Sequence, residues 1–294
     1  MNSRTFKANR VTWIGLFSNV FLTCLKLLAG IYGKSAAMIA DAFHSLSDLG
    51  TDIVVLLGFR IIDKPADKSH DYGHGKVETL VLVVIGVVLL AAGLKICWSG
   101  SYRVFKFYQG RSIPEPGLIA FYVAVISIIS KEWLYRYTLK TGKGINSRAV
   151  IANAWHHRSD AFSSIATMIG IGGAIMLGER WHILDPIAAI VVSFFIIKTA
   201  IVISADGINE LIDASLDDRT ENRIMDVVRS VPGANMPHNL KTRKIGNHIA
   251  VELHIKVNKD LNIEKGHDIS TMVEKKIKEV FGEDVFISVH IEPS

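Results

Sequence analysis

The chain has few of the features that stabilise or process a secreted domain. It has only two cysteines, Cys24 and Cys97, each within an apolar stretch, which disfavours a disulfide framework and favours small buried hydrophobic side chains. The apolar run behind the polar, basic start lacks a small-residue cleavage site, so we expect it to be retained as the first helix. The motif HExxH is also absent, which argues against an intramembrane zinc hydrolase.

The composition is too apolar for an ordinary soluble domain. Hydrophobic residues make up 49% of the 294 residues, and the mean hydropathy is positive. Lys and Arg (33) outnumber Asp and Glu (28), but these charges lie mostly in loops beside apolar segments. Basic cytoplasmic loops of a membrane protein produce the same balance, so nucleic acid is not predicted as a partner. The sequence predicts a multi-pass membrane protein in contact with lipid.

Six apolar stretches are long enough to cross a membrane. Each is close to the ~20 residues that a helix needs to span hydrocarbon. Six crossings put both termini on one side. Eleven basic residues lie in the N-terminal tail and the second and fourth loops, against five in the other loops, so the positive-inside rule places both termini in the cytoplasm. The stretches lie near residues 11–32, 36–61, 77–99, 117–138, 148–178 and 183–205.

A nine-residue pattern occurs twice, in the second and fifth stretches. ADAFHSLSD at residues 40–48 and ANAWHHRSD at residues 152–160 share their Ala, aromatic, His, Ser and Asp positions. The His and Asp of each copy are four residues apart, so each pair projects from one helix face. Because three crossings separate the copies, the two helices run in opposite directions, and both aspartates fall near mid-membrane, roughly 18 Å from a helix end. The pairs are His44 with Asp48 and His156 with Asp160.

These pairs predict a metal ion held between the second and fifth helices. Unpaired His and Asp are costly within a membrane, so matched pairs indicate a shared cation. Two imidazoles and two carboxylates suit tetrahedral Zn²⁺, with Fe²⁺, Co²⁺ or Cd²⁺ as weaker candidates, whereas nitrogen ligands disfavour Mg²⁺ and Ca²⁺. A midplane ion site between opposed helices is typical of secondary transporters. A structural polar cluster between helices is the alternative interpretation.

Spacing leaves the neighbouring residues ambiguous. His157 also lies within reach of Asp160, and the repeat alone favours His156. Further polar residues lie on the same two helices and form a polar stripe with the His and Asp pairs. They are interpreted as supporting the ligands, as lining a water pathway, or as simple helix packing. These residues are Asp41, Asp52, Asn153 and Ser164.

The periodicity of the sequence changes near residue 207. DRTENRIMDVVRSV predicts a helix, HNLKTRKIG and HIAVELHIKVN predict strands, IEKGHDISTMVEKKIKEVFG predicts a helix, and DVFISVHIEP predicts a last strand. This αββαβ order fits a small ferredoxin-like domain over residues 207–294, behind a six-helix transmembrane domain over residues 1–206. In the last two strands the apolar residues alternate inward, which leaves His254, His290 and Glu292 on the opposite face.

Together, these motifs resemble the cation diffusion facilitator family, proton-coupled exporters of divalent transition metals, and especially its bacterial zinc transporters. The resemblance covers nearly the whole chain and rests on the two HxxxD pairs, DKSHDYGHGKVE, SIISKEWLYRYT, ELIDASLDD and the terminal ISVHIEP. It implies a homodimer in which each protomer has a transport site at His44, Asp48, His156 and Asp160. Some relatives have Asp in place of His44, and manganese-type relatives use more oxygen and amide ligands, so the pattern here resembles the zinc-preferring one. The lack of a targeting segment fits a bacterial inner membrane.

The resemblance also implies two cytoplasmic metal sites. Asp67, His70 and His74 form D-x-x-H-x-x-x-H after the second stretch and match a peripheral metal site of the family, although a solvated polar loop has the same composition. In the soluble domain, exposed polar residues on a sheet face are the alternative to a second site. Relatives often have Asp where Glu292 stands, which leaves the number of bound ions open. The matching residues there are His238, His254, His267, His290 and Glu292.

Two further features follow from the resemblance. Lys76 matches a family lysine that pairs with an aspartate after the sixth helix, here Asp213, and an exposed pair of this kind would contribute little stability. The loop TGKGINSR between the fourth and fifth stretches lacks the His-rich insert of many eukaryotic relatives, so metal capture by this loop is not expected.

The predicted activity is exchange of Zn²⁺ for protons, and no enzyme activity is expected. Zn²⁺ binds from the cytoplasm when both imidazoles are neutral and both carboxylates are ionised, and a more acidic exterior protonates the site and displaces the ion. The alternative is a membrane-anchored metal sensor or scaffold of the same fold that binds metal and rearranges without transport.

Overall fold

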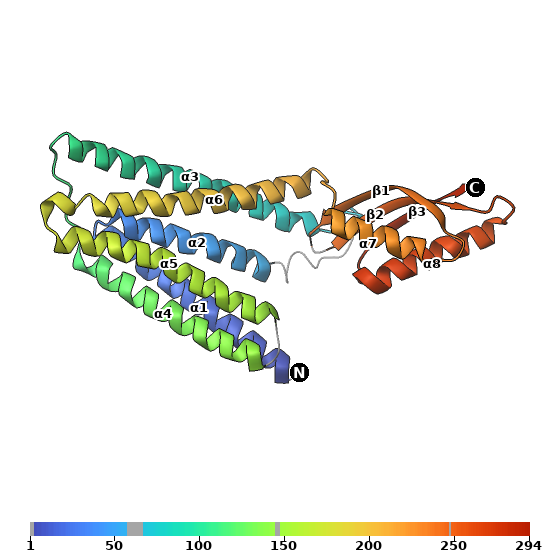
Figure 1. The fold of residues 1–294 in the computed structure, drawn as a ribbon, viewed down its shortest axis with the longest axis horizontal. Coiled ribbons are helices and arrows are strands. Elements are labelled where there is room, and N and C mark those ends of the chain that lie inside the picture. Colours follow the sequence, from blue (N-terminus) through green and yellow to red (C-terminus); the bar gives the residue numbers. More distant parts are fainter. Residues whose placement is uncertain (1–2, 58–66, 145–147, 247) are drawn as a thin grey trace. The chain divides into compact units, whose positions relative to one another are not determined.

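The computed structural model describes residues 3–57, 67–144, 148–246 and 248–294 (Figure 1). The chain divides into two compact units, Met1–Ile53 with Val84–Ser204 and Val54–Val83 with Ala205–Ser294. The first unit is a bundle of helices, and the second contains the small α/β domain. A domain boundary after residue 206 remains a prediction from the sequence.

Six long helices correspond to the six predicted stretches. Five described segments are long and apolar enough to cross a membrane: Arg10–Tyr32, Gly75–Tyr108, Leu118–Gly144, Asn153–Met176 and Glu179–Leu211. The sixth helix, α2, has 22 residues and contains three aspartates. The prediction of a helical membrane domain is confirmed. The helices are α1 (Ser3–Tyr32), α2 (Ala36–Leu57), α3 (Gly75–Tyr108), α4 (Leu118–Gly144), α5 (Arg148–Met176) and α6 (Leu184–Leu211).

Glycines allow α3 and α6 to pack closely along their length (Figure 1). Gly86, Gly93 and Gly100 recur at every seventh position of α3 and face α6. A Cβ atom on Gly93 would lie 2.9 Å from Cγ1 of Ile197, and one on Gly100 would lie 2.8 Å from Cγ1 of Ile190. Small residues are enriched at helix contacts in membranes because they let the backbones approach each other. A larger side chain at these positions would therefore force the two helices apart.

The start of α2 is capped by a side chain from α6. The Asp185 carboxylate accepts hydrogen bonds from the Ser35 hydroxyl, from the Ala36 N–H at 2.7 Å and from the Ala37 N–H at 3.3 Å. Asp185 itself is 2% exposed. The first N–H groups of a helix have no partner within the helix, and an anion there also complements the helix dipole. The contact therefore holds α2 against α6.

Replacement of Asp185 by alanine is expected to destabilise the folded protein. The change leaves the Ser35 hydroxyl and two backbone N–H groups without their acceptor, which costs about 1–3 kcal/mol. Thermal unfolding of the purified protein in detergent measures the loss as a lower melting temperature. Asp206→Ala is the matched control, because Asp206 is an exposed aspartate on the same helix. Equal melting temperatures for the two variants would contradict the capping role.

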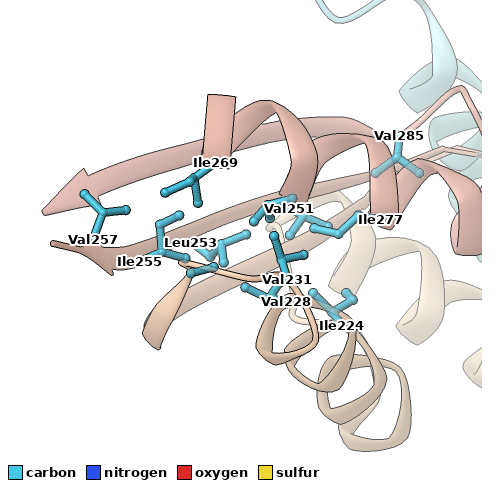
Figure 2. Close-up of a cluster of buried hydrophobic side chains, with 12 residues drawn as sticks. Ile224, Val228, Val231, Val251, Leu253, Ile255, Val257, Ile269, Ile277 and Val285 are labelled. Carbon is cyan, nitrogen blue, oxygen red and sulfur yellow. The ribbon is translucent and has the colours of Figure 1, made fainter. Parts of the chain in front are cut away.

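The second unit contains the predicted αββαβ domain. Its central strand is β2, which pairs antiparallel with β1 and parallel with β3. Side chains from α7 and α8, such as Val228 and Ile277, pack with Leu253 of β2 in the core shown in Figure 2. The order of elements and the inward alternation along β2 are confirmed. The elements are α7 (Asp218–Arg229), β1 (Asn235–Ile245), β2 (His248–Val257), α8 (Ile263–Phe281) and β3 (Phe286–Pro293).

Candidate metal centre

Three of the four predicted transport ligands lie close together between α2 and α5. His44, Asp48 and Asp160 each offer one ligand atom, and these atoms lie within 4.8 Å of one another. Asp160 is 4% exposed, and the two residues of α2 are half-buried. An imidazole and two carboxylates that converge in a buried position provide the donor types of a divalent transition-metal site.

The imidazole of His44 has unused bonding capacity at this position. Its Nδ1 atom is buried, and none of the described residues forms a hydrogen bond with it. Buried polar atoms in folded proteins almost always have a partner. A metal ion or an ordered water molecule would supply that partner, so the surroundings of His44 fit a cation site.

The two adjacent histidines of α5 point to different places. Nε2 of His156 lies 3.7 Å from Oδ1 of Asp160, and the His156 side chain is 52% exposed. His156 thus contacts one ligand of the group but is not among the three residues that converge. His157 is 2% exposed, and its ring lies against Gly15 of α1. His156 is therefore the histidine that contacts Asp160.

A buried lysine also contacts the group. Nζ of Lys131 on α4 lies 2.7 Å from Oδ2 of Asp160 and donates a hydrogen bond of 2.8 Å to Oδ1 of Asn19 on α1. The Lys131 side chain is 2% exposed. Because an unpaired charge is costly within a membrane, this ammonium and this carboxylate stabilise each other.

Asp41, for which ligand support, a water pathway or helix packing were the open interpretations, pairs with a second buried lysine. Nζ of Lys26 on α1 lies 2.8 Å from Oδ2 of Asp41. The hydroxyls of Ser164 and Ser163 on α5 donate to the same carboxylate at 2.9 and 3.1 Å. Lys26 also donates to Ser45 and Ser164. These contacts join α1, α2 and α5 beside the candidate site.

Two further residues of the polar stripe were predicted beside this group. Asn153 is half-buried, and its predicted role remains a prediction. The side chain of Asp52 lies outside the part of the chain that the structure describes.

The predicted loop site brings Asp67, His70 and His74 together. Their ligand atoms lie within 4.8 Å of one another, and the two imidazole rings are 4.3 Å apart between centroids. Oδ1 of Asp67 accepts hydrogen bonds from the hydroxyl and N–H of Ser69, at 2.6 and 2.8 Å, and from the N–H of His70. The hydrogen bond from the Ser69 hydroxyl is the main cause that lowers the pKa of Asp67, which favours the ionised carboxylate.

In the soluble domain, three strands carry a histidine at the same level of the sheet. His238 of β1 pairs with His254 of β2, which pairs with His290 of β3. Nδ1 of His254 lies 2.8 Å from Oε1 of Glu292, and Nε2 of His238 lies 3.3 Å from Oε2 of the same residue. The hydrogen bond from His254 is the main cause that lowers the pKa of Glu292. His267 lies exposed on α8, outside the described group of His238, His254 and Glu292.

β1 is irregular on both sides of His238. Its pairing with β2 shifts between Asn235 and His238 and again between His238 and Lys241. Met236 and Asn239 have positive φ angles, 45° and 50°. Bulges of this kind change the direction of side chains near functional sites. The irregular part of β1 therefore coincides with the position at which His238 contacts Glu292.

Comparison with known proteins identifies the family. Residues 12–212 match the model of the cation efflux transmembrane domain, and residues 216–294 match that of the cation efflux protein cytoplasmic domain. The chain belongs to the cation diffusion facilitator family. The resemblance inferred from the motifs is therefore confirmed.

Several relatives of this facilitator cover most of its length. The manganese efflux system protein MneP of Bacillus subtilis is 31% identical over 290 residues, 97% of this chain and 96% of that protein. Metal tolerance protein C1 of Arabidopsis thaliana is 34% identical over 98% of this chain, which spans 63% of the plant protein. A solved structure, the metal-bound C-terminal domain of the CzcD transporter from Thermotoga maritima, matches with a TM-score of 0.23 and 23% identity over 26% of this chain and 94% of that one.

Sequence reasoning missed several residues that surround the candidate centre of this facilitator. Lys26 and Lys131 are charged residues in apolar stretches, so the rule that singled out the aspartates also applies to them. Pro237, inside β1, was the signal for an irregular strand, because proline in a strand marks an edge or a bulge. The partners of these residues come from distant parts of the chain and required the fold.

The predicted pair of Lys76 and Asp213 is present. Nζ of Lys76 in the first turn of α3 lies 2.7 Å from Oδ1 of Asp213, just after α6, and Arg243 approaches Oδ2 at 4.0 Å. The hydrogen bond from Lys76 is the main cause that lowers the pKa of Asp213. The pair is exposed, so we expect a small contribution to stability.

Asp213→Asn is expected to remove a pH-dependent part of this stability. Because the pKa of Asp213 is lower in the folded state, its contribution is present above the unfolded pKa of ~3.9 and is lost as the pH falls through the lower folded value. The melting temperatures of wild type and variant should therefore differ at pH 7 and converge at pH below ~4. Asp206→Asn, at an exposed site, should show no such convergence. A difference that grows with acidification would contradict the assignment.

Proposed function

We propose that this cation diffusion facilitator exports a divalent transition metal, with Zn²⁺ as the preferred ion, in exchange for protons. The observation that carries the proposal is the convergence of His44, Asp48 and Asp160, within 4.8 Å, on two helices of opposite sequence direction. His156, 3.7 Å from Asp160, supplies the fourth donor after a side-chain movement. Family membership supports metal efflux as the activity.

The ligand types support zinc. Imidazole nitrogens favour Zn²⁺ over Mg²⁺ and Ca²⁺, and two imidazoles with two carboxylates complete a tetrahedral shell. The proposed mechanism uses the same atoms for metal and protons. The imidazoles bind metal when they are neutral, so an acidic exterior protonates the site and releases the ion outside. The protonated site then returns to the cytoplasmic side, which completes the exchange.

The proposed assembly is a homodimer with both termini in the cytoplasm, in a bacterial inner membrane. The excess of basic residues in the N-terminal tail and the second and fourth loops supports this orientation. The match of residues 216–294 to the cytoplasmic domain of the family supports a cytoplasmic soluble domain. In that domain His238, His254, His290 and Glu292, with His267, would bind regulatory Zn²⁺, and Asp67, His70 and His74 would bind a peripheral ion.

Manganese is the second candidate cargo. It is favoured by the manganese efflux relative MneP, which matches 97% of this chain. The ligand set argues for zinc, because Mn²⁺ prefers oxygen donors and higher coordination.

Single ligand changes are expected to abolish zinc flux in proteoliposomes with an imposed pH gradient. His44→Ala removes the nitrogen donor of α2, and Asp160→Asn removes the negative charge of α5 while keeping a similar side-chain size. His157→Ala, which changes the adjacent histidine against Gly15, is the matched control and should retain flux in a folded preparation. Unimpaired flux in either ligand variant would refute the site.

Alanine variants of the soluble-domain histidines, together with wild-type flux, distinguish an exporter from a metal sensor or scaffold. An exporter with His254 and His290 both changed to alanine should retain flux, because these residues lie in the other unit. A sensor would bind zinc through these histidines and show no pH-gradient-dependent zinc movement in the wild type either.

Competition in inside-out vesicles is expected to rank the cargo ions. Across an imposed proton gradient, unlabelled Zn²⁺ should reduce the uptake of labelled Zn²⁺ more than equal concentrations of Cd²⁺, Fe²⁺ or Mn²⁺, because nitrogen ligands favour Zn²⁺. Stronger competition by Mn²⁺ than by Zn²⁺ would assign the facilitator to manganese.

A further inference from the structure

Lys131 contacts the candidate transport site although it is not one of the predicted ligands. Its ammonium lies 2.7 Å from Oδ2 of Asp160 and 2.8 Å from Oδ1 of Asn19, so α1, α4 and α5 meet at one buried charge. The Lys131 side chain is 2% exposed, and that of Asp160 is 5% exposed. Separation of such a pair leaves an uncompensated buried charge, which is strongly destabilising, so the ion pair between Lys131 and Asp160 is expected to stay intact.

The two oxygens of Asp160 have different surroundings. Oδ2 accepts the hydrogen bond from Lys131, whereas Oδ1 lies 3.7 Å from Nε2 of His156. A carboxylate can bind a metal ion through one oxygen or through both. While Lys131 donates to Oδ2, it competes with a metal ion for that oxygen and disfavours binding of the ion through both oxygens of Asp160.

Lys131 also changes the charge of the site. With neutral imidazoles, the carboxylates of Asp48 and Asp160 carry two negative charges, and the ammonium of Lys131 offsets one of them. Hard cations that prefer many oxygen ligands depend on carboxylate charge, whereas the bond of Zn²⁺ to imidazole does not. Competition for Oδ2 and less negative charge act in the same direction, against Mn²⁺.

We propose that Lys131 is a specificity-determining residue: by occupying Oδ2 of Asp160, it keeps the transport site at low coordination and favours Zn²⁺ over Mn²⁺. This inference rests on the proposed function, because Asp160 must be a metal ligand. Lys131 acts through Asp160, so it is a positioning residue.

The facilitator provides a matched control for a purely structural role. Lys26 is also buried and also pairs with an aspartate, Asp41, at 2.8 Å. Its other hydrogen bonds go to Ser45 and Ser164, and neither of these residues is one of the four predicted ligands. A structural effect of removing a buried lysine should therefore appear in both variants, and an effect on metal choice should appear in Lys131 variants alone.

The experiment measures metal preference in the full-length protein in detergent. His70, His74, His254 and His290 are first changed to alanine to remove cytoplasmic ligands. Lys131→Gln and Lys131→Met, a polar and an apolar replacement, are compared with Lys26→Gln. The readouts are the ratio of Zn²⁺ to Mn²⁺ dissociation constants and the visible absorption of bound Co²⁺, which is stronger for four-coordinate than for six-coordinate Co²⁺. Lys131→Arg keeps the charge and tests rescue.

In the folded variants, loss of Lys131 should reduce the preference for Zn²⁺ over Mn²⁺ by ~10-fold or more and weaken the Co²⁺ absorption. Lys26→Gln should leave both readouts near the starting values, and Lys131→Arg should restore them. Unchanged readouts in both Lys131 replacements, or equal changes in Lys26→Gln, would overturn the inference. Asp160→Asn separates the two failures: if it leaves Co²⁺ absorption unchanged, the proposed function itself fails.

Discussion

A buried charge without a partner is costly among apolar helices, and this constraint accounts for the main polar contacts of the bundle. Asp41 pairs with Lys26, Asp160 pairs with Lys131, and Asp185 accepts from the first N–H groups of α2. In each case the two partners come from different helices. Dispersion contacts between apolar helices are weakly directional, whereas a buried pair exists at one relative position, so these contacts set how the helices lie against each other.

The candidate transport site is built into this network. Asp160 has one oxygen in a structural ion pair and the other near His156, so the same side chain supports the packing of α4 and α5 and faces the proposed ion. In the soluble domain, the course of the strands brings the candidate ligands together. There, His254 lies on a regular strand, and an irregular β1 brings His238 to the same carboxylate, Glu292. The candidate transport site depends on buried charges, and the group in the soluble domain depends on the irregular backbone of β1.

Local patterns in the sequence predicted much of the fold. The six helices and the αββαβ order were predicted because periodicity is a local property, and the repeat predicted the approach of His44, Asp48 and Asp160. The end of α3 was predicted near residue 99, where the apolar stretch ends, but the helix continues to Tyr108. Its last turns contain aromatic and basic residues, which lower the hydropathy without ending the helix.

The partners of Lys131 and Lys26 were not predictable, because the spacing of residues along one helix does not determine which other helix packs against that face. The same limit applies to His156 and His157, since both satisfy helical spacing to Asp160 and packing against α1 separates them. The positive φ angles of Met236 and Asn239 likewise arise from the pairing of β1 with β2.

The row of glycines on α3 restricts how the facilitator can change shape. Gly86, Gly93 and Gly100 bring the backbone of α3 against Ser204, Ile197 and Ile190, spaced seven residues apart on α6. An axial slide by one turn would press these isoleucines against larger side chains of α3 such as Leu89 and Leu90. A slide of α3 along α6 is therefore sterically opposed where these glycines meet α6.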